Sequence, residues 1–138
     1  MKTLKLLILA LSLTNLVYSQ DRILTGQVVD SEFKPLISAI VLKNTGGQGI
    51  RTNEQGFFQL VISSEVTEIQ IQYIGYRTEN VKIKNKCHIN IIMFGDLLVD
   101  WKSVGQEEKY FQKKRRALRK SYKKAIINGL LQEEKECE

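Results

Sequence analysis

Short runs of alternating apolar and polar residues, separated by turn-forming residues, constrain this chain more than any other feature. Residues 26–58 read GQVVDSEFKPLISAIVLKNTGGQGIRTNEQGFF and contain three strand-like runs. The clearest alternation lies in residues 66–74, where one face carries Ile69, Ile71 and Tyr73 and the other carries Glu68, Gln70 and Gln72. A period of two residues is that of a strand with one buried face. The pattern therefore predicts a β-sheet protein.

Seven such runs follow one another at spacings of about ten residues, with turn signals between them. They are residues 23–30, 39–43, 50–52, 57–62, 66–74, 78–84 and 86–94. Regularly spaced short strands are typical of an antiparallel sandwich. We therefore predict a mainly β chain, folded as a seven-stranded antiparallel Greek-key β-sandwich, with its core drawn from one face of each run.

The last run, residues 86–94, decides how the single histidine is interpreted. Cys87, Ile89, Ile91 and Met93 share the face predicted to point inward, and His88, Asn90, Ile92 and Phe94 share the other. No carboxylate or cysteine pattern neighbours His88, so we expect it on the surface, without a role as ligand or base.

Glycine-rich and polar connections between the runs are interpreted as turns. Residues 44–49 (NTGGQG) precede strand-like residues, whereas a phosphate cradle needs a helix N-terminus after the glycines. Asn53 and Gly56 suit a tight turn, because Asn bonds its own backbone and Gly accepts positive φ. The loop offers too few carboxylates for calcium. We predict no catalytic, cofactor-binding or metal-ligating residues, no small-molecule substrate, and no enzyme activity.

The first 19 residues (MKTLKLLILALSLTNLVYS) have the pattern of a signal peptide. Lys2 and Lys5 precede a short apolar run, and Ser19 suits cleavage before Gln20. The run is shorter than the roughly 20 residues that span a bilayer. We therefore expect export, to a periplasm or to an outer-membrane-associated location.

Two cysteines, Cys87 and Cys137, leave the thiol chemistry open. In an exported chain they could pair. Cys87 lies in a strand-like run, however, and Cys137 lies one residue from the end of the sequence. We favour reduced or intermolecular thiols over an intramolecular disulfide.

The net charge of +6 is concentrated near the C-terminus. Residues 20–100 hold 8 Lys/Arg against 9 Asp/Glu, whereas residues 101–138 hold 11 against 6. Any argument about anionic partners therefore concerns the second segment. We divide the chain into a β-sandwich domain at residues 20–95, a linker at 96–105 and a basic helical tail at 106–138.

The tail has the composition of a helix. Residues 106–131 contain no proline, Glu107 and Glu108 suit a helix N-terminus, and Gly129 can end or weaken the last turn. The acidic cluster of Glu133, Glu134, Glu136 and Glu138 is expected to fray into solvent. Phe111, Leu118, Tyr122, Ala125 and Ile126 fall on one helical face, which predicts a basic amphipathic helix.

Three interpretations of this helix remain open. Its apolar face docks on the sandwich or on a partner protein with the cations solvated, or the helix lies on an anionic membrane surface, or it binds nucleic acid. Because an exported protein seldom meets nucleic acid, we expect an envelope protein or an anionic membrane surface as partner. The candidate contact residues are Phe111, Lys113, Lys114, Arg115, Arg116, Leu118, Arg119, Lys120, Tyr122, Lys123 and Lys124.

Four sequence fragments, in fixed order, resemble a known family. They are Gly26-x-Val28-x-Asp30, Pro35-Leu36-x-x-Ala39-x-Val41, Thr52-Asn53-x-x-Gly56-x-Phe58 and Tyr73-Ile74-Gly75-Tyr76. Over residues 22–94 the chain resembles the carboxypeptidase-like regulatory domain, a transthyretin-like β-sandwich. Asn53 stands where the family usually has an acidic residue.

This resemblance implies a fold, a location and a class of role. Such domains occur behind metallocarboxypeptidase domains, at the N-termini of TonB-dependent outer-membrane receptors and as short exported proteins of Gram-negative bacteria, and they have no active site of their own. We therefore expect a non-catalytic, exported binding or structural module of the cell envelope, attached through its helix. The alternative is an accessory or regulatory domain that acts with a TonB-dependent transport system.

Overall fold

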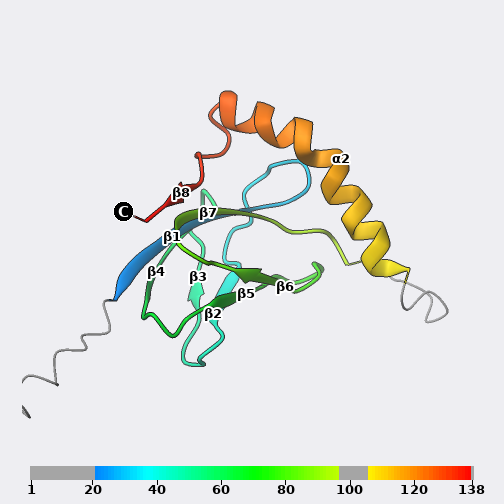
Figure 1. The fold of residues 1–138 in the computed structure, drawn as a ribbon. Helices are drawn as coiled ribbons and strands as arrows, with labels where there is room; N and C mark the ends of the chain where they lie inside the picture. The colour runs from blue at the N-terminus through cyan, green and yellow to red at the C-terminus, as the bar shows by residue number, and fades with distance from the viewer. Residues whose placement is uncertain (1–20, 97–105, 138) are drawn as a thin grey trace, which may run out of the picture.

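Two four-stranded sheets and one long helix make up the described part of the chain, as the computed structural model shows (Figure 1). The structure describes residues 21–96 and 106–137. The predicted signal peptide and nearly all of the predicted linker lie outside the described residues.

The first sheet has the strand order β4-β1-β7-β8 and the second has the order β3-β2-β5-β6. The strands are β1 (Arg22–Val29), β2 (Ile40–Lys43), β3 (Ile50–Arg51), β4 (Phe57–Ile62), β5 (Glu68–Gln72), β6 (Glu79–Lys82), β7 (Lys86–Ile92) and β8 (Lys135–Glu136). The helix is α2 (Glu107–Ile127). Each of the seven predicted strand regions overlaps one of β1 to β7, which confirms a mainly β chain with one C-terminal helix.

One hydrophobic core lies between the sheets, and the predicted alternation locates it. In β4, Phe58, Leu60 and Ile62 are buried while Val61 is exposed. In β5, Ile69 and Ile71 are fully buried. Both strands belong to the same cluster of buried side chains although they lie in different sheets. This arrangement is consistent with the predicted β-sandwich.

The pairing of β1 with β7 is parallel, so the prediction of a wholly antiparallel fold is wrong for this pair. The chain between these two strands forms β2 to β6, so no hairpin connects them and forces opposite directions. Gly26 faces Ile89 across the pair. A Cβ at Gly26 would lie 2.5 Å from the Phe58 ring and 2.6 Å from the Ile89 carbonyl oxygen, so only glycine fits.

The turn before β4 has the predicted chemistry. The Asn53 side-chain oxygen accepts hydrogen bonds from the backbone N–H groups of Gln55 (3.0 Å) and Phe57 (2.9 Å). Gly56 adopts a φ of 74°. Thr52 tightens the neighbouring connection, because its hydroxyl donates to the Leu36 carbonyl and accepts from the Ala39 N–H. These fragment residues are therefore structural.

The eighth strand corrects the prediction for the acidic C-terminal end. Residues 133–138 were expected to fray into solvent, but Lys135 and Glu136 form β8 on the edge of β7, with a register shift between Lys86 and His88. The exposed edge of β7 offers unpaired backbone groups, which a returning segment can satisfy. Among the helices that the structure describes, none has the length and apolar character needed to cross a membrane.

Candidate interaction surface

The helix α2 begins and ends where its sequence indicates. Glu107 and Glu108 lie in its first turn, where carboxylates interact favourably with the helix dipole. At the other end Gly129 has a φ of 72°, and the Leu130 N–H donates to the Ala125 carbonyl oxygen at 2.9 Å. This glycine-centred bond pattern is a Schellman motif. Of the two alternatives for Gly129, the structure shows that this residue ends the helix.

The N-terminal half of α2 docks on the sandwich through Phe111, which is fully buried. Its ring centroid lies 5.7 Å from that of Phe94, which lies two residues after the end of β7. The Arg77 guanidinium lies 4.8 Å from the Phe111 ring centroid, within the range of cation–π attraction. The predicted apolar face of the helix is therefore covered here by the chain's own sandwich.

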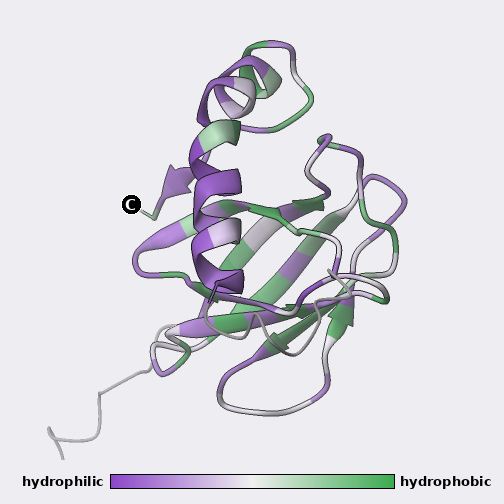
Figure 2. Cartoon of the chain, turned by 90° about the vertical axis from the view of Figure 1, so that its right-hand side faces the viewer, coloured by the Kyte–Doolittle hydropathy of each residue, from purple (hydrophilic) through white to green (hydrophobic). Residues whose placement is uncertain are grey.

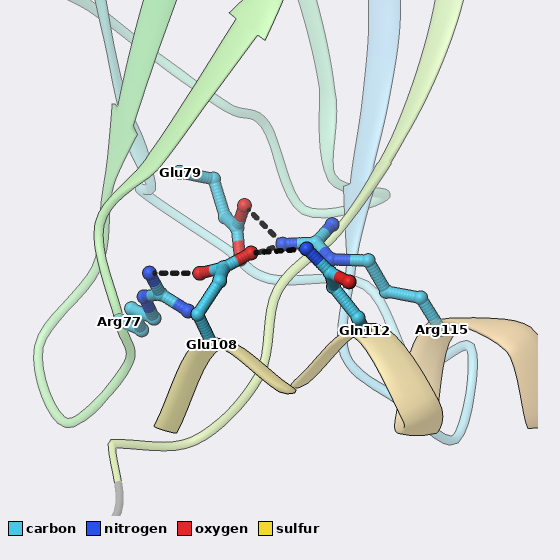
Figure 3. Close-up of polar contacts among 5 residues, drawn as sticks. All are labelled: Arg77, Glu79, Glu108, Gln112 and Arg115. Carbon is cyan, nitrogen blue, oxygen red and sulfur yellow. Dashed lines mark hydrogen bonds and ion pairs between the residues drawn. The ribbon is translucent and has the colours of Figure 1, made fainter. Parts of the chain in front are cut away.

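Two ion pairs flank this contact (Figure 3). Arg77 donates to Glu108 at 2.8 Å, and this hydrogen bond lowers the pKa of the Glu108 carboxyl. Arg115 donates through Nη2 to both carboxylate oxygens of Glu79, at 2.7 and 2.5 Å. Since Glu79 lies in β6, the Arg115–Glu79 pair connects α2 to the second sheet, and Arg77 lies two residues before that strand.

The C-terminal half of α2 packs against a second, smaller hydrophobic cluster. Ala125 is buried with Val29 and Leu131, and the half-buried members around them are Phe33, Ile92, Tyr122 and Ile126. The cluster lies on the outer face of the first sheet, on the side opposite the main core. Helix packing therefore covers apolar side chains that the alternation of β7 places outward.

Asn90 of β7 joins the helix to the segment that follows it. Its side-chain nitrogen donates to the Tyr122 hydroxyl at 3.0 Å and to the Gln132 carbonyl oxygen at 2.6 Å. Lys86 forms an ion pair with Glu134 in the same region. Burial raises the pKa of the Tyr122 hydroxyl. These polar contacts therefore hold both the end of α2 and the segment after it, at Gln132 and Glu134, against β7.

A disulfide between Cys87 and Cys137 closes this region, with Cα atoms 5.0 Å apart. Our preference for reduced or intermolecular thiols is therefore wrong. The Cys137 N–H donates to the Asn85 carbonyl oxygen at 2.8 Å, so the pairing of β8 beside β7 brings the two cysteines together. Because the two cysteines are 50 residues apart in the sequence, local sequence patterns did not indicate that they lie side by side.

The candidate contact residues divide into two groups. Phe111 is buried in the docking contact, Lys114, Leu118 and Tyr122 are half-buried, and Arg115 is engaged by Glu79. The others are exposed and form no ion pair among the described residues: Lys113, Arg116, Arg119, Lys120, Lys123 and Lys124. In Figure 2 most of the visible turns of α2 have the colour of hydrophilic residues. We call these six residues the basic face.

A groove of about 580 Å³ lies beside α2, where the helix meets β7. Ile92, Leu118, Tyr122 and Ile126 form its apolar walls, and its cationic lining is Arg115, Arg119, Lys120 and Lys123. Sequence reasoning missed Ile92 as part of this surface. The available signal was that the predicted outer face of residues 86–94 carries two apolar side chains, Ile92 and Phe94, that require a cover.

His88 is only 6% exposed, so the prediction of a surface histidine is wrong. The docked C-terminal segment covers the outer face of β7, where His88 lies. Its Nδ1 is 2.9 Å from the Thr25 hydroxyl, its Nε2 is buried without a hydrogen-bond partner, and burial lowers its pKa. Among the described residues no group of three or more His, Cys, Asp or Glu side chains is placed to hold a metal ion.

Comparison with known proteins gives one family. The model of the CarboxypepD_reg-like domain matches residues 24–97, slightly more than half of the chain. This confirms the resemblance of the sandwich to the carboxypeptidase-like regulatory domain. No curated protein matches the chain. The matched region runs from the third residue of β1 to beyond the end of β7, whereas α2 and β8 follow it. The chain belongs to the family of the CarboxypepD_reg-like domain.

Proposed function

We propose that the protein is a non-catalytic binding or structural module, exported to the cell envelope, in which α2 attaches the sandwich to an envelope protein or an anionic membrane surface. The observation that carries this proposal is the basic face. Six cations that have no acidic partner within residues 21–96 and 106–137 lie on a helix whose opposite face is docked on the sandwich. Membership of a regulatory-type domain family supports the non-catalytic part.

The disulfide supports export. Disulfides persist mainly in oxidising compartments, such as a periplasm, and cytosolic thiols are kept reduced. Both cysteines of the chain are paired in the structure. Together with the signal-peptide pattern of residues 1–19, this argues for a location outside the cytosol.

The docked geometry supports attachment through charge. A free amphipathic helix binds membranes by burying its apolar face. Here Phe111 and Ala125 are already buried against the sandwich, so the basic face and the groove beside it are the parts of α2 left for a partner.

Export is tested by fractionating the source organism and sequencing the N-terminus of the mature protein. We expect a chain that begins at Gln20, in the envelope fraction, with cysteines that resist alkylation until a reductant is added. A variant without residues 1–19 is the control and should remain cytosolic. A cytosolic, full-length, reduced wild-type chain would refute the proposal.

Attachment is tested by charge reversal. The double substitution Arg116→Glu and Lys120→Glu should release the protein from the envelope fraction, because both side chains belong to the basic face. Lys82→Glu with Lys84→Glu is the matched control, since it makes the same charge change at exposed positions of the sandwich. Equal release by the two variants would point to net charge alone and remove the helix from the proposal.

A second candidate follows from family membership: an accessory or regulatory domain that acts with a TonB-dependent outer-membrane transport system. A strain lacking the gene would then lose uptake through one such system, and uptake would return with the wild-type protein but not with the Arg116→Glu, Lys120→Glu variant. Unchanged uptake through all such systems of the organism would exclude this role.

A further inference from the structure

The groove beside α2 combines an apolar interior with a cationic rim. Its walls come from two elements, with Ile92 on the strand side and Leu118, Tyr122 and Ile126 on the helix. The volume of about 580 Å³ lies within the range of roughly 300 to 1,000 Å³ typical of small-molecule sites. Apolar walls with a few charged groups at the edge suit a ligand that has both an apolar and an anionic part.

The four cations of the rim differ in whether they form an ion pair with a carboxylate. Arg115 is held by Glu79 and therefore belongs to the docking contact. Arg119, Lys120 and Lys123 are exposed and form no ion pair among the residues that the structure describes. Arg119 and Lys123 are four residues apart, so they lie on the same side of the helix and one turn from each other.

The docking of α2 also restricts how a membrane can be contacted. Phe111 and Ala125 would have to leave the sandwich before the helix could insert its apolar face among lipids. The disulfide to Cys137 and the hydrogen bonds of Asn90 oppose that release. A membrane contact that keeps the observed fold therefore has the basic face and the groove available, and the groove adds apolar walls to cations.

We propose that this groove binds an anionic phospholipid at a membrane surface. The acyl chain lies against Ile92, Leu118 and Ile126, and the phosphate is held by Arg119 and Lys123. The inference rests on the attachment role proposed above and gives it a ligand class. Charge complementarity identifies the occupant: three spare cations surround an apolar space of small-molecule size.

The first experiment measures partition of the purified, oxidised protein onto vesicles. Binding should be strong on mixed phosphatidylcholine–phosphatidylglycerol vesicles and weak on phosphatidylcholine alone. Arg119→Gln with Lys123→Gln should weaken partition by about thirtyfold, as expected from on the order of 1 kcal/mol per basic residue at an anionic surface.

A matched control lies on the same helix. Lys113→Gln with Arg116→Gln also removes one lysine and one arginine, but neither residue lines the groove. This variant should lose less than about threefold, because neither side chain lines the groove and the attraction of more distant cations to the lipid is screened by salt. Circular dichroism and thermal unfolding should match the wild type for both variants, since all four side chains are exposed.

The second experiment tests for a defined site. Monomeric dihexanoyl phosphatidylglycerol is titrated into the protein and methyl resonances are followed by NMR. Ile92, Leu118 and Ile126 should shift and saturate, whereas dihexanoyl phosphatidylcholine and inorganic phosphate should shift them weakly. Leu118→Gln should weaken the binding, and Ile127→Gln should not, because Ile127 is 82% exposed and does not line the groove.

Four results would overturn the inference. Equal losses in the two charge variants would indicate diffuse attraction, and silent groove methyls would mean that no lipid enters. Equal shifts with the two lipids would remove the anionic requirement, and a dimer that dissociates on Leu118→Gln would identify a second copy as occupant.

Envelope retention with no lipid binding would refute only this inference. A cytosolic chain would refute the proposed function, while the titration of purified protein would still be valid.

Discussion

Arg115 on the helix and Glu79 on the edge strand of the second sheet form an ion pair in which one guanidinium nitrogen contacts both carboxylate oxygens, at 2.7 and 2.5 Å. The Glu79 side chain is 8% exposed and the Arg115 side chain is 45% exposed. The pair thus connects a helix outside the family match to a strand within it.

The first prediction concerns that pair. Arg115→Gln removes the cation and leaves the Glu79 carboxylate nearly buried, so the free energy of unfolding should fall by about 1 to 2 kcal/mol, a value reduced by the solvent exposure of Arg115. Urea denaturation measures the change. Arg116→Gln is the control, because its side chain is exposed and has no acidic partner among the described residues, and it should change stability by less than about 0.5 kcal/mol. Equal effects would show that the Arg115 pair contributes nothing specific.

The second prediction concerns Phe111, which is fully buried against Phe94. Phe111→Ala should cost about 3 kcal/mol of unfolding free energy, because it removes a large apolar contact and leaves a cavity. Hydrogen exchange should increase most in the first turns of α2. Ile127→Ala, at an 82% exposed position of the same helix, should leave both measurements unchanged. Unchanged exchange in the Phe111 variant would mean that the helix does not depend on this contact.

The third prediction concerns the disulfide. Cys87 and Cys137 are 50 residues apart along the chain, so their cross-link removes conformational freedom from the unfolded chain. The double substitution Cys87→Ser and Cys137→Ser should lower the free energy of unfolding by about 4 kcal/mol, as expected for a loop of this size. Urea denaturation of the wild type with and without dithiothreitol should give the same difference. The Ser variant should not respond to dithiothreitol, and a response there would show that the reductant acts elsewhere.

The fourth prediction concerns pH. Burial lowers the pKa of His88 below its ordinary value of about 6.5. Between the folded-state pKa and about 6.5, the unfolded chain binds a proton that the folded chain does not. Stability should therefore rise with pH through this window, level off above it, and fall as the pH decreases from about 6.5. Urea midpoints measured across pH test the sign.

His88→Gln is the variant that isolates this effect. Gln has no titrating group but can still hydrogen-bond the Thr25 hydroxyl, and the chain contains no other histidine. The pH dependence between about 5 and 7 should become flatter in this variant. A slope identical to that of the wild type would place the proton uptake on another group.

Local patterns predicted much of the sandwich and of the helix. The alternation in residues 66–74 identified Ile69 and Ile71 as core residues, because a strand with one buried face repeats every two residues. The turn at Asn53 was equally accessible, since its side chain bonds backbone groups only two and four residues away. Strand alternation and turn chemistry of this kind depend only on residues close together in the sequence, so both can be recognised without the structure.

The candidate surface was predicted only in part. Helical periodicity placed Phe111, Tyr122 and Ala125 on one face, but it did not indicate what that face packs against. The groove needed Ile92 as well, which lies in a strand that is separated from α2 by 14 residues, 93–106. The buried state of His88 was missed for the same reason, because the segment that covers it follows later in the chain.

By itself, the sequence determined the β-rich character of residues 22–92, their turns, the extent of α2 and the segregation of basic charge onto it. Tertiary structure alone decided the parallel pairing of β1 with β7, the return of β8, the Cys87–Cys137 disulfide and the Arg115–Glu79 pair. The physical reason is range. Periodicity and turn chemistry depend on neighbours within one or two turns, whereas these four contacts depend on which distant surfaces meet when the helix covers the outer face of the first sheet.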